Sequence, residues 1–237
     1  MPAAIYRETF DQGPGGWLGF ASNAIGGKPL EIKDSCAISR SPWWIDYNHA
    51  PPGAGYLNLL YILQTRGPFG EHQREIQGEN QFAARQCPLN FTNARMTLKL
   101  RGELETRGTQ LVLLVQDVSG GICSGWLLTG QPLRVTPQWS EQTVTCVPDE
   151  SQWTNLGSRH DRRDFYGHLP LSTVLSNVNV NILLVLFPLT IAPMGTIAGD
   201  PHTLRPEKDY PVWRSRLPEG YVHLDEVKIE FAEAAQA

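Results

Sequence analysis

The densest group of residues able to do chemistry lies in one loop, residues 41–55, with the sequence SPWWIDYNHAPPGAG. Three aromatic and three hydrogen-bonding side chains form this group: Trp43, Trp44, Tyr47, Asp46, Asn48 and His49. The aromatic rings offer flat apolar faces for a sugar ring, and the loop's prolines and glycines restrict its backbone. We expect a preorganised binding site here. In the alternative, the tryptophans close one end of the fold and Asp46 caps a turn.

Residues 70–85 carry a second pattern, with Glu or Gln at every second position: Glu71, Gln73, Glu75, Gln77, Glu79 and Gln81. On a strand these side chains would share one face. Such a row suits a polyhydroxylated ligand, with Glu71 and Glu79 as ligand-binding residues. A charged edge strand or a solvated loop would give the same pattern.

The two regions together also contain candidates for catalysis. His49 beside Asp46 predicts a general base, and Glu75 supplies a second carboxylate. Glycoside hydrolysis uses two carboxyl groups about 5–5.5 Å or about 6.5–9.5 Å apart. A small lyase, hydrolase or isomerase acting on a sugar or metabolite is therefore the alternative to binding alone. Metal ligation by His49, His72 and Glu75 has no compact motif in its favour.

Residues 158–168 mix both charge signs with aromatic side chains and interrupt the strand pattern. Functional loops have this composition. Solvated loops held by local ion pairs have it too, and we favour that interpretation.

The elements that must position these loops are short strands. Stretches rich in aliphatic residues, or alternating between apolar and polar ones, predict strands at residues 56–65, 95–101, 111–115, 143–147, 178–187 and 221–231. In the last stretch the apolar positions change phase between Leu224 and Val227, which predicts a bulge at Asp225 and Glu226. Without convincing long amphipathic helices, the pattern indicates an all-β, antiparallel jelly-roll β-sandwich with long loop insertions, a single domain over residues 1–237.

Charge and composition exclude several classes of partner. The 237 residues include 20 Lys and Arg against 24 Asp and Glu, a net charge of −4. No basic surface for nucleic acid or membrane lipid is therefore expected. Four widely spaced cysteines without a C-x-x-C pair indicate packed, reduced thiols. With no signal segment visible at the start, we expect a cytoplasmic protein of bacterial type.

Three short motifs in chain order carry a family resemblance. Residues 9–17 read TFDQGPGGW, residues 222–227 read VHLDEV, and between them stand Trp139, Val144, Val147-Pro148 and Trp153-Thr154. These resemble the opening, the terminal strand and an intervening turn of galactose-binding-like, jelly-roll carbohydrate-binding modules attached to xylanases and cellulases. Those modules are usually shorter, about 130–170 residues by the resemblance, secreted and tethered to a catalytic domain.

The resemblance implies a structural calcium ion between the first and last strands, with Glu8, Asp11 and Asp225 as its ligands. Calcium prefers several hard oxygen ligands, which these carboxylates would supply in part. The alternative is a solvated turn carboxylate at Asp11 and an exposed Asp225. Our hypothesis from the sequence is a stand-alone carbohydrate-binding module, with homo-oligomers left open.

Overall fold

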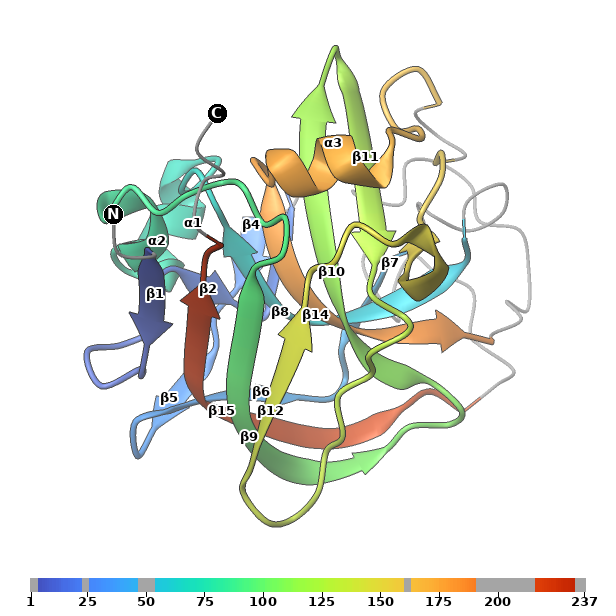
Figure 1. Cartoon of the computed structure of the whole chain (residues 1–237). Helices are drawn as coiled ribbons and strands as arrows, with labels where there is room; N and C mark the ends of the chain where they lie inside the picture. The colour runs from blue at the N-terminus through green and yellow to red at the C-terminus, as the bar shows by residue number, and fades with distance from the viewer. Residues whose placement is uncertain (1–3, 23–25, 47–53, 160–162, 191–215, 233–237) are drawn as a thin grey trace.

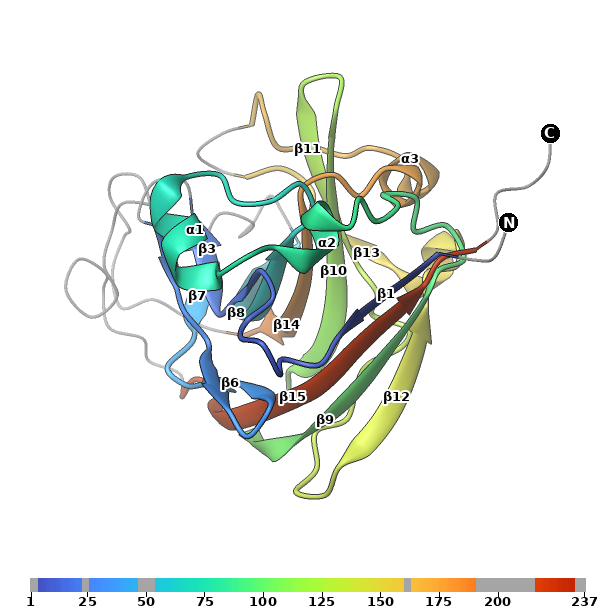
Figure 2. The same cartoon turned by 90° about the vertical axis from the view of Figure 1, so that its left-hand side faces the viewer.

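Two antiparallel sheets packed face to face form the computed structural model, which describes all residues except 1–3, 23–25, 47–53, 160–162, 191–215 and 233–237 (Figures 1 and 2). The predicted all-β sandwich is confirmed. Among the described residues, no helix is long and apolar enough to cross a membrane.

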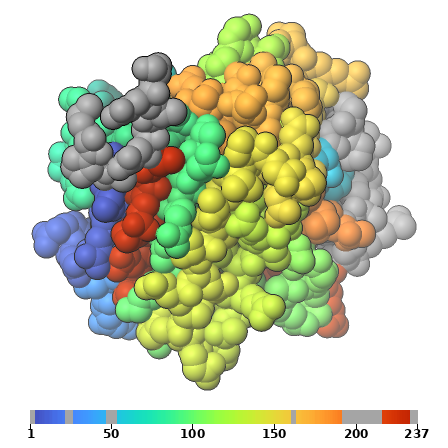
Figure 3. Space-filling model, in the orientation of Figure 1, coloured from blue at the N-terminus to red at the C-terminus, as the bar shows by residue number. Residues whose placement is uncertain are grey.

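The first sheet, sheet A, has six strands in the order β12-β9-β15-β6-β5, with β1 also paired to β15. Its strands are β1 (Ile5–Glu8), β5 (Glu31–Lys33), β6 (Cys36–Arg40), β9 (Arg95–Glu105), β12 (Ser140–Thr145) and β15 (Glu219–Glu230). Strands from both ends of the chain thus lie side by side, and Figure 3 shows β1, β15, β9 and β12 together at the surface.

The second sheet, sheet B, has seven strands in the order β13-β11-β10-β14-β8-β2, with β7 also paired to β8. Its strands are β2 (Trp17–Leu18), β7 (Trp44–Asp46), β8 (Tyr56–Gln64), β10 (Gln110–Ser119), β11 (Ile122–Leu127), β13 (Thr154–Asn155) and β14 (Asn181–Leu189). A separate hairpin joins β3 (Phe20–Ser22) to β4 (Gly26–Lys28).

The helices are short: α1 (Glu71–Gln77), α2 (Gln81–Ala84), α3 (Leu171–Ser176) and a 3₁₀ turn, η1 (Glu150–Gln152). The predicted strand over residues 70–85 is therefore wrong. In a helix, residues four apart share a face and residues two apart do not. Glu71 and Glu75 accordingly face solvent while Gln73 and Gln77 are buried, so the continuous row of acids and amides does not exist.

The other strand predictions, from alternation or from runs of aliphatic residues, are confirmed. β8, β9, β10, β12, β14 and β15 overlap the six expected stretches. The predicted bulge is present as well: the pairing of β15 with β9 shifts register between Leu224 and Glu226.

Sheet B is buried on both faces. Between the sheets, side chains such as Leu113, Val115 and Leu184 join the main core with Leu98 and Val222 of sheet A. On its other face a second core is formed by Leu18, Phe20, Leu57, Leu59, Ile62, Val112, Leu114, Leu127, Leu156, Leu183, Val185 and Phe187. Among the described residues, the outward side chains of β9 and β15 in sheet A are instead half-buried or exposed, so this face is available to a ligand.

Two glutamine side chains link edge strand β12 of sheet A to the segment that precedes it. The carboxamide of Gln131 accepts from the backbone N–H of Thr145 at 2.9 Å and donates to its carbonyl at 3.1 Å. The carboxamide of Gln142 makes the same pair of bonds with Arg134, at 2.8 and 2.7 Å. The segment that precedes β12 is thereby tied along this edge strand.

The four cysteines are free thiols, as expected. Cys36, Cys123 and Cys146 are buried and Cys87 is half-buried. Burial raises the pKa of the Cys146 thiol to about 12.

Gly102 lies in the middle of β9, where β15 passes unusually close. A Cβ atom at this position would stand 2.2 Å from the carbonyl oxygen of Tyr221, which is backbone and cannot rotate away. Only glycine therefore allows the backbones of β15 and β9 to approach this closely.

We expect Gly102→Ala to lower the free energy of unfolding by about 2–4 kcal/mol, because the two central strands of sheet A must separate to admit the methyl group. Urea denaturation measures this. Gly70→Ala is the control, since nothing lies within 4 Å of its added Cβ. Equal stability of the two variants would contradict the close approach.

Candidate functional site

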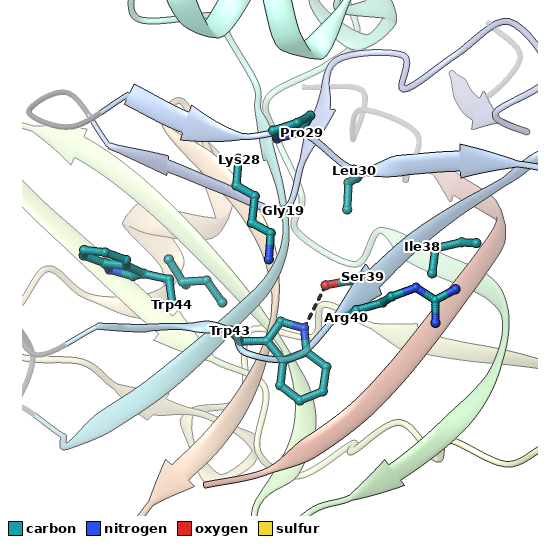
Figure 4. Close-up of a pocket in the computed structure, with 10 residues that line it drawn as sticks. Gly19, Lys28, Pro29, Leu30, Ile38, Ser39, Arg40, Trp43 and Trp44 are labelled. Atoms are coloured by element: carbon teal, nitrogen blue, oxygen red, sulfur yellow. Dashed lines mark hydrogen bonds between the residues drawn. The ribbon is translucent and has the colours of Figure 1, made fainter. Parts of the chain in front are cut away.

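The two tryptophans of the predicted binding loop pack against the protein and are not displayed to a ligand. Trp43 is 7% exposed, and its indole Nε1 donates to Ser39 Oγ at 2.9 Å (Figure 4). Trp44 stacks on Phe20 with ring centres 4.5 Å apart. The pocket between them holds about 20 Å³, room for about one water molecule. Both rings thus take the packing role that the sequence left as the alternative.

Asp46 lies close enough to Tyr166, a residue of the charged loop at 158–168, to affect its pKa. The guanidinium carbon of Arg159 stands 4.2 Å from the ring centre of Tyr166, and Arg159 is 1% exposed. Burial raises the pKa of Tyr166, the Asp46 carboxylate raises it further, and Arg159 lowers it. Arg159 is therefore buried against Tyr166, whereas Arg163, Asp164 and His168 of the same loop are exposed, as the solvated interpretation expects. Tyr47, Asn48 and His49 lie outside the described residues.

The acidic residues of the second predicted region have exposed positions. Glu71 and Glu75 lie on the solvent side of α1, and Glu79 follows the helix and accepts from Gln81 Nε2 at 3.0 Å. The helix packs on β2 and β4. These carboxylates therefore do not line a common strand face, the arrangement on which their predicted ligand-binding and catalytic roles depended.

The three predicted calcium ligands have different surroundings. Glu8 is buried, and its Oε1 accepts from the backbone N–H groups of Thr9 and Phe10 at 3.1 and 2.9 Å. Asp11 is exposed and accepts from Thr9 Oγ1, while Asp225 is 2.7 Å from Lys99 Nζ. In the described part of the chain, no three His, Cys, Asp or Glu side chains group to hold a metal ion. Only Glu8 is placed as a buried ligand would be.

A different group of side chains gathers on the outer face of sheet A. We call it the aromatic–arginine face, and its members are Arg40, Arg101, Glu103, Trp139, Tyr221 and His223. Strand pairing brings them together: Tyr221 of β15 lies between Arg40 of β6 and Glu103 of β9, and His223 lies opposite Arg101. Alternation along each strand points these residues away from the core.

Rings and guanidinium groups alternate across this face. The Tyr221 and His223 rings have centres 5.2 Å apart, and His223 lies 6.5 Å from Trp139. The guanidinium carbons of Arg40 and Arg101 lie 5.3 Å from the Tyr221 ring centre and 4.6 Å from that of Trp139. Such cation–π contacts hold the long arginine side chains in place.

The face is hollowed and accessible. A depression of about 390 Å³ is lined by Arg40, Arg101, Gly102, Glu103, Pro137, Tyr221 and His223. Trp139 beside it is 36% exposed, which is unusual for so large an apolar side chain. Rigid aromatic rings next to hydrogen-bonding groups are typical of ligand sites.

Sequence reasoning missed this site although part of its signal was visible. The alternation over residues 95–101 placed Arg101 on the solvent face, and Trp139 had been singled out only for the family motif. The members come from four segments far apart in the chain, and nothing local to one segment shows that they meet.

Comparisons with known proteins leave the family open. No family model matches the chain, and no curated protein matches it. Among solved structures, a chain from a study of endo-acting O-glycanases that human gut bacteria express to initiate mucin breakdown is similar over 96% of this chain and 99% of its own. Its sequence identity is 10% and its TM-score 0.37, values too low to carry an argument about function.

Burial lowers the pKa of His223 below its ordinary value of 6.5, and the positive charges of Arg101 and Arg40 lower it further. As the pH falls through 6.5, the unfolded chain takes up this proton first, so the folded state loses stability. We expect the melting temperature to fall more between pH 7 and pH 5 for the parent than for His223→Gln. His72→Gln controls for loss of an exposed imidazole. Parallel curves for the parent and His223→Gln would contradict the assignment.

Calcium at the end of β1 stays a prediction, centred on Glu8. We expect calcium to raise the melting temperature of chelator-treated protein by several degrees, because a ligand that binds only the folded state stabilises it. Glu8→Gln should abolish this response, and Glu79→Gln, which changes an exposed carboxylate, should keep it. No shift with calcium in the parent would remove the proposal.

Proposed function

We propose that the protein binds carbohydrate on the aromatic–arginine face. The observation that carries the proposal is the exposed row formed by Trp139, His223 and Tyr221, with Arg40, Arg101 and Glu103 around it. Sugar rings present apolar C–H faces to aromatic rings, and their hydroxyls bond to charged donors and acceptors at the edge. Both kinds of group are present within one depression.

The shape of the face favours an extended ligand. Strand pairs hold Tyr221 and His223 on β15, and a sheet is rigid compared with a loop. The depression is open rather than enclosed, so a chain of sugars can enter from the side without a lid. Little ordering of the protein is then needed on binding, which favours useful affinity from a modest contact area.

The same geometry favours binding over glycoside hydrolysis. Hydrolysis of a glycosidic bond generally needs two carboxyl groups facing one another. Of the residues that line the depression, Glu103 alone is a carboxylic acid. The guanidinium group of arginine does not give up its proton in proteins, so arginines do not replace an acid–base residue.

Affinity electrophoresis against xylan, mixed-linkage β-glucan, galactan and polygalacturonate tests the proposal. We expect at least one polysaccharide to retard the parent, and Trp139→Ala and Tyr221→Ala each to weaken binding about tenfold or more, as loss of a central aromatic contact does. Phe69→Ala is the matched control, because Phe69 is 52% exposed and precedes α1, away from sheet A.

Binding that survives both substitutions at Trp139 and Tyr221 would place the carbohydrate site elsewhere on the protein. Release of reducing sugars by the parent in the same samples would contradict the binding-only role.

A further inference from the structure

We infer that the ligand of the aromatic–arginine face is an acidic sugar, a hexuronic acid unit whose carboxylate is bound by Arg101 and Arg40. This inference rests on the proposed function and names the class of carbohydrate. Its basis is the distribution of charge within the depression, which is lined by two arginines and one glutamate.

Arg101 is the basic residue on this face that has no acidic partner among the described residues. Its neighbours on the same sheet surface are paired: Lys99 Nζ lies 2.7 Å from Asp225, and Arg40 Nε lies 3.1 Å from Glu31. The guanidinium group of Arg101 instead stacks over Trp139 at 4.6 Å and lines the depression. Stacking uses the flat face of the group and leaves its N–H groups, which lie in the plane, for an acceptor.

Arg40 approaches the same depression from the other side of β15. Its Nε is occupied by Glu31, while the described hydrogen bonds leave its terminal nitrogens without a partner. The guanidinium carbon lies over Tyr221 at 5.3 Å, so this ring has a cation at one of its faces. A carboxylate entering above β15 would thus meet guanidinium donors on two sides.

The positive charges of the two arginines act on His223 at the centre of the face. Both lower the pKa of His223, which lies between them on β15, and Glu31 opposes this effect only in part. Lys33 adds to the positive field from β5. Glu103 is the single acid lining the depression, and it stands on the far side of Tyr221 from Arg40.

A planar carboxylate fits these donors better than a neutral hydroxyl does. Guanidinium groups bind carboxylates through two parallel N–H bonds, and such charge-assisted bonds are about twice as strong as neutral ones. The adjacent Tyr221 and Trp139 rings supply the apolar contact that a bare inorganic anion would not use. A ring carrying a carboxylate at its edge satisfies both features at once.

Isothermal titration with an oligogalacturonate and with its carboxyl-reduced, neutral form tests the inference. We expect the parent to bind the acidic form at least tenfold more tightly, and this preference to shrink as sodium chloride is raised from about 50 to about 500 mM. Arg101→Gln and Arg40→Gln should each weaken binding of the acidic form about tenfold and binding of the neutral form by less, so that the preference for the acidic form shrinks. Arg74→Gln on α1 is the matched control.

The outcomes separate this inference from the proposed function. If both forms bind equally and Trp139→Ala abolishes both, carbohydrate binding stands and the acidic-sugar inference fails. A preference for the acidic form that persists in both arginine variants also overturns it. A sulfated oligosaccharide that binds more tightly than the uronate would overturn the choice of carboxylate. If no oligosaccharide binds the parent, the proposed function fails as well.

Discussion

The pairing of β15 with β9 is the interaction on which the rest of the structure depends. β15 bonds to β9 along nearly its whole length, and its other side is shared between β6 and β1. It therefore joins the first, middle and last parts of the chain in one sheet. The same ladder holds Tyr221 and His223 at fixed positions on the outer surface, so the candidate site is as rigid as the sheet itself.

Sheet B explains why the open surface is on sheet A. Apolar side chains cover both of its faces, including Val112, Leu114 and Val185 on the face turned away from sheet A. That second core includes Phe20 and Ala21 of β3 together with Trp44. Trp43 and Trp44, which looked suited to a ligand, are thus used for packing, and a different set of aromatic residues is left exposed.

The fold was predictable because strands with alternating apolar residues carry their own signal. Leu98 and Leu100 between Thr97, Lys99 and Arg101 indicate both a strand and the face it buries. The helix α1 was missed because its Glu and Gln residues repeat at intervals of two, which imitates a strand. Only the tertiary structure shows that Gln73 and Gln77 are the buried side chains.

The candidate site was harder to predict for a physical reason. Arg40, Arg101, Trp139 and His223 meet through strand order, and the order of strands in a sheet is set by long-range packing rather than by local sequence. The sequence indicated that Arg101 faces solvent, but it contained nothing to show which strands would flank it. The loop at residues 41–55 attracted attention because its aromatic residues are adjacent in the chain.

The two glutamines along β12 have a consequence for how copies of this protein meet. An unprotected edge strand is a template onto which another chain can add, because its backbone N–H and C=O groups are unpaired. The carboxamide of Gln131 has the same donor and acceptor as a peptide unit and binds the backbone of Thr145 as a neighbouring strand would, while Gln142 of β12 ties the backbone of Arg134 to the same edge. A second molecule that extended the sheet here would first have to displace them. We therefore expect any homo-oligomer of this protein to form through another surface. Strand addition is disfavoured at the edge of sheet A nearest the candidate site.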